Sequence, residues 1–286
     1  MQLAVITDEI DDDLEHALDV MAEYDVRGVE LRQLWNTHVL ELTDDQRTRA
    51  RDLIAQHNMV VVGIATPFYK CDLPGETGTE PAGPLHSATA LGLADQIDLL
   101  QRSFKTAAFF DAKLIRIFTF WKRRTLSPDL EDKIVDLLAE PVALAEEAGF
   151  ILGLENEHAC YIGTGAQTAR IVERVASPAL RVIWDPGNAY CDGERPFPNG
   201  YDDVKEFIDH VHVKDAKFDA VSGKPEWTVV GDGAIDWTGQ IKALHESGYK
   251  GFLSLETHYS GPGGKEASSR ACLEGLSSII KAACSN

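Results

Sequence analysis

Eight short apolar runs, each followed by a longer amphipathic or polar segment, are the feature that most constrains the fold. Each run has about four to six residues rich in Val, Ile, Leu and Phe. Such runs are too short for a helix and continuous enough for a strand that is buried on both faces, as in a parallel sheet. The expected strands cover residues 3–6, 28–31, 60–64, 114–118, 151–155, 181–185, 210–213 and 252–256.

Helical patterns fill the segments between these runs. They cover residues 12–24, 43–57, 88–110, 127–148, 164–175, 202–208, 236–248 and 265–283. Thr43 with Gln46 three positions later predicts a capping box, and Gly149 is suited to end the helix 127–148. Eight strands that alternate with eight helices predict an α/β fold, a (β/α)₈ TIM barrel, as a single domain over residues 1–286.

Missing motifs narrow the class of protein. No GxGxxG or GxxxxGK[ST] follows the first strand, which argues against the usual nucleotide-binding folds. No linker rich in Pro, Gly or Ser divides the chain. The longest stretches that we expect to be irregular, residues 66–84 and 190–200, follow the third and sixth strands, on the face where barrel loops build active sites.

Charge and apolar length limit the partners. The 46 acidic and 27 basic residues give a net charge of -19, which repels phosphate backbones, so we expect no nucleic-acid partner. No apolar stretch is long enough to span a membrane, and the N-terminal segment lacks the pattern of a signal peptide, so we expect a cytoplasmic protein. Five scattered cysteines without a CxxC pair are expected to be free thiols.

Polar side chains end four successive strands in the second half of the chain. The segments LENEH, WDPGN, HVHVKD and LETH carry Glu155, Asp185, the pair His210 and His212, and Glu256. Each carboxylate alone also fits a turn, a helix cap or a surface ion pair. Because barrel strands end at one mouth, however, three carboxylates would repel one another there without a cation. Carboxylates with an imidazole favour an ion such as Mn²⁺ or Mg²⁺.

The segments LENEH, WDPGN, HVHVKD, GDGAIDW and GYKGFLSLETH, in this order, resemble the xylose-isomerase-like TIM barrels called sugar phosphate isomerases/epimerases. That family includes ketose 3-epimerases, hydroxypyruvate isomerases and inosose dehydratases. The resemblance covers residues 149–258, with an echo at 28–31. It implies one divalent ion, with Mn²⁺ favoured over Mg²⁺ or Co²⁺, and it selects His212 over His210 because the family's ligand stands two residues before Lys-Asp. The implied ligands are Glu155, Asp185, His212 and Glu256.

We therefore expect an isomerase or epimerase that acts on a small-molecule carbohydrate: a keto-sugar, a polyol or a sugar phosphate. Glu155 and Glu256 would be its catalytic residues, one removing and the other returning the proton beside a carbonyl through a metal-stabilised enediolate. Return to the same carbon gives epimerisation, and return to the neighbouring carbon gives isomerisation. The sequence leaves this choice open, as it leaves open assembly into a homo-oligomer.

Further polar residues are expected to contact the substrate. They are His158, Asn188, His210, Lys214 and Arg116. His158 is placed to orient a hydroxyl, and Lys214 to hold a carboxylate, a phosphate or Glu157. Asn188 stands where 3-epimerases carry a histidine, which weakens a simple 3-epimerase assignment. Glu30 and Arg32, two residues apart, are expected to share a face and to pair inside the mouth.

Three alternatives remain beside the isomerase. The same enediolate can expel a leaving group, which would make the protein a dehydratase of a keto-inositol or 3-keto-sugar, or an enzyme that cleaves C-glycosides. An apurinic-site endonuclease shares the barrel, but it needs a basic groove and extra histidines, whereas strands three and four end in GIAT and RIFT. A sugar-binding barrel without catalysis is the third alternative.

Overall fold

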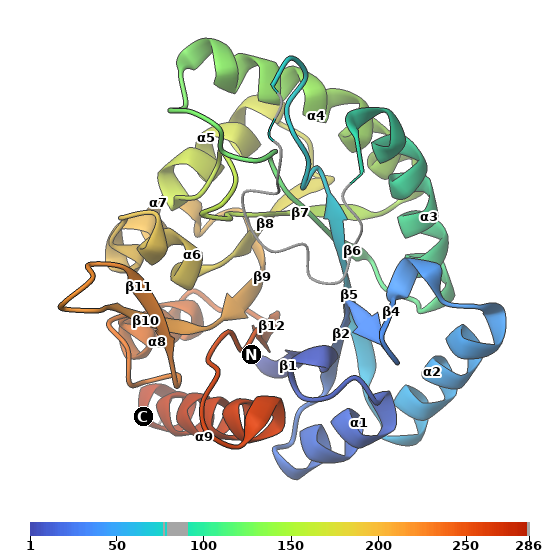
Figure 1. Ribbon diagram of the computed structural model, residues 1–286, viewed down its shortest axis with the longest axis vertical. Coiled ribbons are helices and arrows are strands. Elements are labelled where there is room, and N and C mark those ends of the chain that lie inside the picture. The colour runs from blue at the N-terminus through green and yellow to red at the C-terminus, as the bar shows by residue number, and fades with distance from the viewer. Residues whose placement is uncertain (77, 79–90, 285–286) are drawn as a thin grey trace.

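The computed structural model describes residues 1–76, 78 and 91–284. They form a closed barrel of eight parallel strands inside a ring of helices, which confirms the expected TIM barrel (Figure 1). β1 pairs with both β2 and β12 and so closes the ring. The barrel strands are β1 (Gln2–Ile6), β2 (Gly28–Leu31), β5 (Val60–Phe68), β6 (Leu114–Ile117), β7 (Ile151–Glu155), β8 (Leu180–Trp184), β9 (Ile208–Val213) and β12 (Phe252–Leu255).

Most of the outer helices lie at the expected positions. They are α1 (Leu14–Glu23), α2 (Asp44–Gln56), α3 (Gln96–Phe109), α4 (Pro128–Ala148), α5 (Gly165–Val175), α7 (Tyr201–Val204), α8 (Trp237–Glu246) and α9 (Gly264–Cys284). The capping box at Thr43 is present, and Gly149 ends α4 with a φ of 74°. A left-handed residue at this position lets the chain turn away from the helix without a Cβ clash.

The main core lies between the strands and the helices. Outward-facing strand residues such as Leu31, Leu154 and Val211 are fully buried there, and each contributes roughly 1.5–3 kcal/mol of stabilisation. The inner face is crowded where strands approach closely. A Cβ at Gly153 would lie 2.6 Å from Ile183 Cγ1, so only glycine fits. Above this packed layer, the inner face toward the mouth carries polar residues.

Some predicted bounds are wrong. The helix expected over residues 202–208 ends at Val204, because Ile208 already pairs with Val182 in β8. Tertiary pairing here overrides a local helical pattern. The third strand reaches Phe68 instead of ending at residue 64. Of the helix expected over residues 88–110, the part at 88–90 lies outside the described residues, and α3 begins only at Gln96.

Additional short elements occupy predicted loops. The stretch 190–200 contains the end of α6 (Pro186–Cys191) and the helical turn η4 (Pro196–Gly200). A hairpin of β10 (Asp215–Phe218) and β11 (Pro225–Thr228) follows β9. A smaller hairpin of β3 (Gln33–Leu34) and β4 (Thr37–His38) follows β2, and short helical turns occur at η1 (Thr7–Glu9), η2 (Val39–Glu41) and η3 (Leu93–Asp95).

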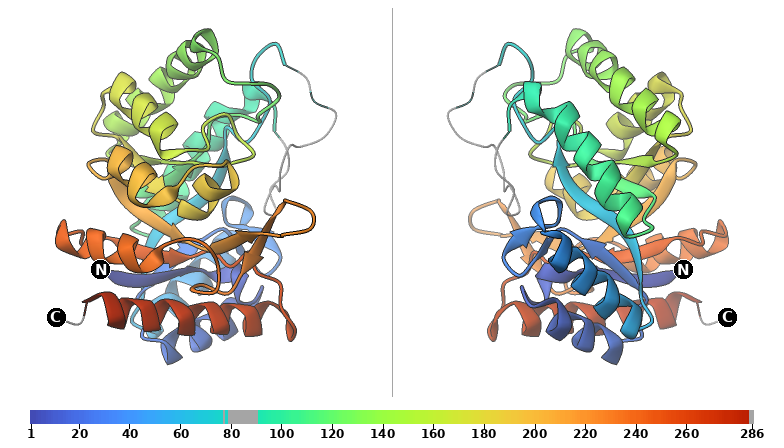
Figure 2. Two further views of the ribbon diagram at one scale, coloured as in Figure 1. Left: turned by 90° about the vertical axis from the view of Figure 1, so that its left-hand side faces the viewer. Right: turned by 90° about the vertical axis from the view of Figure 1, so that its right-hand side faces the viewer.

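The two ends of the barrel differ in what they carry. Both chain termini lie at one end, and the β10–β11 hairpin projects from the other, where the strands end (Figure 2). Among the described residues, no helix is long and apolar enough to cross a membrane. All five cysteines are free thiols, as expected.

Candidate metal centre

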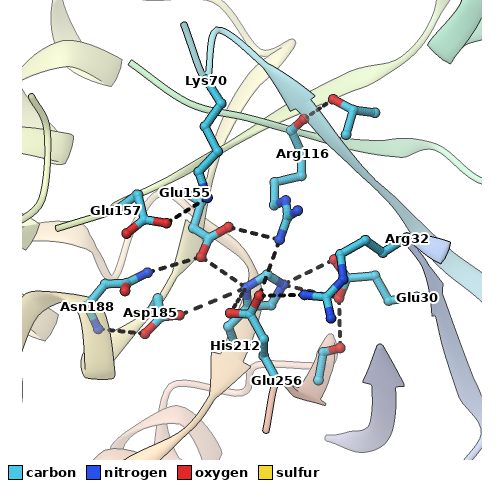
Figure 3. A network of polar contacts seen from close by, with 12 residues as sticks. Glu30, Arg32, Lys70, Arg116, Glu155, Glu157, Asp185, Asn188, His212 and Glu256 are labelled. Carbon is cyan, nitrogen blue, oxygen red and sulfur yellow. Dashed lines mark hydrogen bonds and ion pairs between the residues drawn. The ribbon is translucent and has the colours of Figure 1, made fainter. Parts of the chain in front are cut away.

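The four side chains expected to bind a metal meet at the strand ends. Glu155 ends β7, Asp185 follows β8, His212 lies in β9 and Glu256 follows β12. One ligand atom from each lies within 4.8 Å of the others, and all four residues are buried. Figure 3 shows the three carboxylates pointing toward the His212 ring. Side-chain alternation along the strands places all of them on the inner face.

The donor set fits a divalent cation. Among the described residues, the buried atom His212 Nδ1 has no hydrogen-bond partner. The buried oxygens Glu155 Oε2 and Asp185 Oδ2 make no hydrogen bond but have ion-pair contacts with Arg116 and Lys214. An unsatisfied buried acceptor is costly, and a cation would satisfy His212 Nδ1 while binding the two carboxylate oxygens. Burial raises the pKa of Asp185 to about 6, as expected for a carboxylate placed among others. Three carboxylates and one imidazole suit Mn²⁺ or Mg²⁺, and Zn²⁺ also accepts these donors.

Glu30 orients the imidazole of His212. His212 Nε2 lies 3.1 Å from both Glu30 oxygens, so we assign the ring proton to Nε2 and the free lone pair to Nδ1, on the side of the carboxylates. His210 Nε2 at 3.0 Å and Ser254 Oγ at 2.7 Å also contact Glu30. Burial opposes ionisation of Glu30, but His212 and His210 hold its pKa well below the usual range. His210 therefore lies behind the ligands and supports them through Glu30.

Arg116 and Lys214, both expected to bind substrate, contact the ligand carboxylates. Lys214 Nζ lies 2.8 Å from Asp185 Oδ2 and 2.7 Å from Glu256 Oε2. Arg116 Nη1 lies 3.3 Å from Glu155 Oε2 and 3.5 Å from Glu256 Oε1. Burial alone would raise the pKa of Glu256, but Lys214 and neighbouring histidines hold it well below the usual range. Both cations thus hold the ligand cluster together.

Arg32 ties the first strand to the same cluster. Its guanidinium lies 2.9 Å from Asp8 Oδ2 and 3.3 Å from Glu256 Oε1, and it also donates to Glu9. Arg32 and Glu30 share the mouth face, as expected. Their contacts, however, lead to different partners: Glu30 to the histidines, and Arg32 to the carboxylates of η1 and β12.

His158 stands at the edge of the cluster with a third of its side chain exposed. Its Nδ1 lies 3.0 Å from Glu157 Oε1 and 2.9 Å from Asn188 Oδ1. Burial lowers the pKa of His158, but the Glu157 and Asn188 contacts outweigh burial and raise it. Asn188 also donates from Nδ2 to Glu155 Oε1 at 3.1 Å, so its amide bridges His158 and a ligand.

A buried lysine holds Glu157 in place. Lys70 Nζ donates to Glu157 Oε2 at 2.9 Å and lies over the Phe118 ring, 4.3 Å from its centroid. Lys70 was not among the residues predicted from sequence. It reaches the mouth because β5 continues to Phe68, beyond the predicted end of that strand. The apolar run at residues 60–64 did not indicate this extension, so Lys70 was missed.

Trp227 of β11 lies beside the ligand cluster, on the side of the hairpin. Lys214 Nζ lies 5.4 Å from the centre of its indole, and the His258 and His158 rings lie 4.9 Å and 6.3 Å away. Trp227 was also missed. The hairpin turns at residues 219–224, where Gly223 N–H donates to Asp219 O. Asp and Gly are typical turn residues, and they are the sequence signal that could have indicated this hairpin.

Comparison with known proteins identifies the family and the fold. A family model described as a xylose isomerase-like TIM barrel matches residues 18–278. An inosose dehydratase of Bacillus velezensis is 29% identical over 147 residues, 45% of this chain and 49% of that protein. The chain thus matches about half the length of this curated relative.

Solved structures show the same fold. The IOLI protein with a binding zinc atom superposes with a TM-score of 0.76 at 17% identity over all of both chains. An L-ribulose 3-epimerase superposes with a TM-score of 0.73 at 15% identity, covering 99% of this chain and 96% of the other. At this level of identity the likeness concerns the fold alone.

Proposed function

The chain belongs to the xylose isomerase-like TIM barrel family, and within that family we propose that it is a divalent-metal-dependent dehydratase of a keto-polyol. The observation that carries this proposal is the pairing of His158 with Glu157 and Asn188 beside the ligand cluster. It provides a proton donor separate from the two glutamates. The inosose dehydratase similarity supports the same reaction class.

The residues Glu155, Asp185, His212 and Glu256 would hold the metal, with Mn²⁺ as our first candidate. When bound, a divalent ion supplies Lewis-acid polarisation of the substrate carbonyl. The ion's positive charge then offsets the repulsion between the three carboxylates of the cluster.

Glu155 is the better placed of the two glutamates to accept the proton from the carbon beside the carbonyl. Glu256 faces three cations, Arg32, Arg116 and Lys214, which weaken it as a base. Glu155 forms an ion pair with one of these cations, Arg116, and Lys214 is a further nearby positive charge. Its Oε1 is fixed by the Asn188 amide, so its orientation is set before substrate arrives.

His158 donates the second proton. Its Nδ1–H points to Glu157 and Asn188, which leaves Nε2 to protonate the departing hydroxyl at the β-carbon. The C–H bond breaks to Glu155, the C–O bond breaks with release of water, and a C=C bond forms. Glu155 then loses its proton to solvent, and His158 regains one from solvent. Lys70 keeps Glu157 ionised throughout this cycle.

Isomerisation or epimerisation is the second candidate. Glu155 and Glu256 both belong to the ligand set and come from different strands, β7 and β12, so each can reach a different side of a bound sugar. In that reaction Glu256 returns the proton to carbon, and no group is expelled. A cytoplasmic location and assembly into a homo-oligomer stay predictions from the sequence.

The test is incubation of the Mn²⁺-loaded protein with keto-inositols, 3-keto-glycosides and ketoses in D₂O. Dehydration gives a product lighter by one water, with the ultraviolet absorbance of an enone or diketone. Deuterium incorporation at carbon without loss of water, on any of these substrates, would instead establish the isomerase or epimerase.

A further inference from the structure

The four buried cations that the structure describes are all paired with carboxylates at the mouth. They are Arg32 with Asp8, Glu9 and Glu256, Lys70 with Glu157, Arg116 with Glu155 and Glu256, and Lys214 with Asp185 and Glu256. Loops farther out repeat this pattern, because Lys122 pairs with Asp192 and Arg123 with Asp72. A phosphate or carboxylate on a ligand would therefore have to displace a protein carboxylate from its cation.

A bound divalent ion leaves no surplus positive charge. Seven carboxylates lie in the cluster. Six of them pair with these cations, namely Asp8, Glu9, Glu155, Glu157, Asp185 and Glu256, and Glu30 contacts His210 and His212. Four cations, a divalent ion and the protonated His158 of the proposed mechanism bring seven positive charges to these seven carboxylates. Burying a further anion in this setting is unfavourable, because an uncompensated charge loses its hydration without gaining a partner.

Residues 77 and 79–90 contain no Lys or Arg and one histidine, His86. The net charge of -19 adds a long-range field that disfavours anionic ligands.

The indole of Trp227 is an apolar surface close to the ligand cluster. It lies near Lys214, His158 and His258, at the distances given above. The CH face of a polyol ring packs well on an aromatic face, while its hydroxyls reach the polar groups below.

We propose that this site selects an uncharged ring-shaped keto-polyol, packed against Trp227, and that the paired charges of the mouth exclude phosphorylated and carboxylated substrates. This inference rests on the proposed function only in assuming that the ligand carries a keto group. The selection itself is a matter of binding and can be measured without turnover.

The experiment compares binding of a keto-inositol with binding of the phosphate monoester of the same ring, by calorimetry on the Mn²⁺-loaded Glu155→Gln variant, which lacks the proposed proton acceptor and so does not turn the ligand over. We expect the uncharged ring to bind at least about tenfold more tightly. Its Kd should change little between about 50 and about 500 mM NaCl, since no charge pair forms. A monoester that binds as tightly as the uncharged ring, or more tightly, would overturn the proposal.

A variant pair tests the indole. Trp227→Ala should weaken binding of the uncharged ring by about tenfold, and Trp227→Phe should restore most of the loss. The matched control is Phe218→Ala on the same hairpin, because Phe218 packs on Tyr190 and is 44% exposed. Equal losses in the Phe218 and Trp227 variants would show that only the hairpin fold matters, which contradicts the proposed contact.

The two proposals fail separately. Tight binding of the uncharged ring without loss of water would refute the dehydratase and leave the selection intact. Dehydration of the phosphate monoester with the lower KM would keep the dehydratase and refute the selection.

Discussion

The two halves of the barrel mouth have different chemical roles. Strands β7, β8, β9 and β12 provide the ligand set, whereas the segments after β1 and β2, and strand β6, provide groups that hold it: Asp8, Glu9, Arg32 and Arg116, together with Glu30 at the end of β2. Figure 3 shows Arg116 and Arg32 directed at carboxylates of the other half.

This division teaches that the ligand half is not a stable unit by itself. Three buried carboxylates close together raise the free energy of the folded state unless cations lie beside them. In the described residues, Arg32 and Arg116 from the first half and Lys214 from the second meet that need. Variants in the two halves should therefore differ in what they change, and the following predictions test that difference, from the largest effect to the smallest.

Glu155→Gln should lower kcat by about 10²- to 10⁴-fold with little change in KM, because it removes the proton acceptor and keeps an oxygen. Steady-state kinetics on the true substrate measure this. Glu256→Gln is the comparison within the same half. A dehydratase should lose much less with Glu256→Gln, whereas equal losses would favour two-base isomerisation.

Arg116→Met should destabilise the metal-free protein by about 3–5 kcal/mol, because it leaves buried carboxylates without a partner. Urea unfolding with and without Mn²⁺ measures the loss, and the metal should recover part of it. Lys205→Met, in an exposed pair with Asp202, is the control and should change nothing measurable. A loss below about 1 kcal/mol for Arg116→Met would contradict the supporting role of the first half.

Asp185→Asn is the matched change in the ligand half. Asparagine keeps the oxygen that caps α6 by accepting from Asn188 N–H, but it removes the negative charge. Since burial raises the pKa of Asp185, metal-free stability should hold or rise. The stabilisation by added Mn²⁺ should shrink, as thermal unfolding over a metal titration would show. An unchanged metal-induced shift would remove Asp185 from the ligand set.

His38 in β4 should reveal the cationic field of the first half. Burial, followed by Arg116, lowers its pKa to about 4. The imidazole therefore binds a proton below about pH 6.5 in the unfolded chain but only near pH 4 in the folded protein. The free energy of unfolding should fall as the pH falls through this window, by about 3 kcal/mol in all. His38→Asn should remove this part of the pH dependence in urea unfolding. If the variant kept the same dependence of unfolding free energy on pH, the lowered pKa of His38 would be contradicted.

Glu30→Gln should weaken metal binding by about 10- to 100-fold, because His212 loses the carboxylate that fixes its tautomer. Competition with a chelating dye measures the affinity. Ser254→Ala removes only a hydroxyl donor to Glu30 and should cost a few-fold at most. If the two variants lost equal affinity, Glu30 would act through packing and not through the imidazole.

Away from the mouth, the halves should behave alike. Thr43 is the N-cap of α2 and Thr164 is the N-cap of α5, each with a complete capping box. Thr43→Ala and Thr164→Ala should each cost about 1 kcal/mol of unfolding free energy. Markedly unequal losses would show that the asymmetry extends beyond the site.

The barrel and the ligand cluster were accessible from sequence because both follow from local patterns. Apolar runs of strand length specify buried parallel strands, and a polar residue at the end of such a run must lie at the mouth. Glu155, Asp185 and Glu256 are brought together with His212 as that logic requires, although the choice of His212 over His210 came from the family resemblance. Their role in catalysis and metal binding stays a prediction.

The partners of those residues were decided only by tertiary structure. Lys70 meets Glu157 because β5 runs four residues beyond its predicted end, and Trp227 covers Lys214 because a hairpin folds back over the mouth. Arg32 and Arg116 reach carboxylates more than a hundred positions away in the chain. Sequence spacing determines which face of a strand a side chain takes. Which cation pairs with which carboxylate on that face depends on distances of a few ångströms, and these distances are set only when the barrel closes.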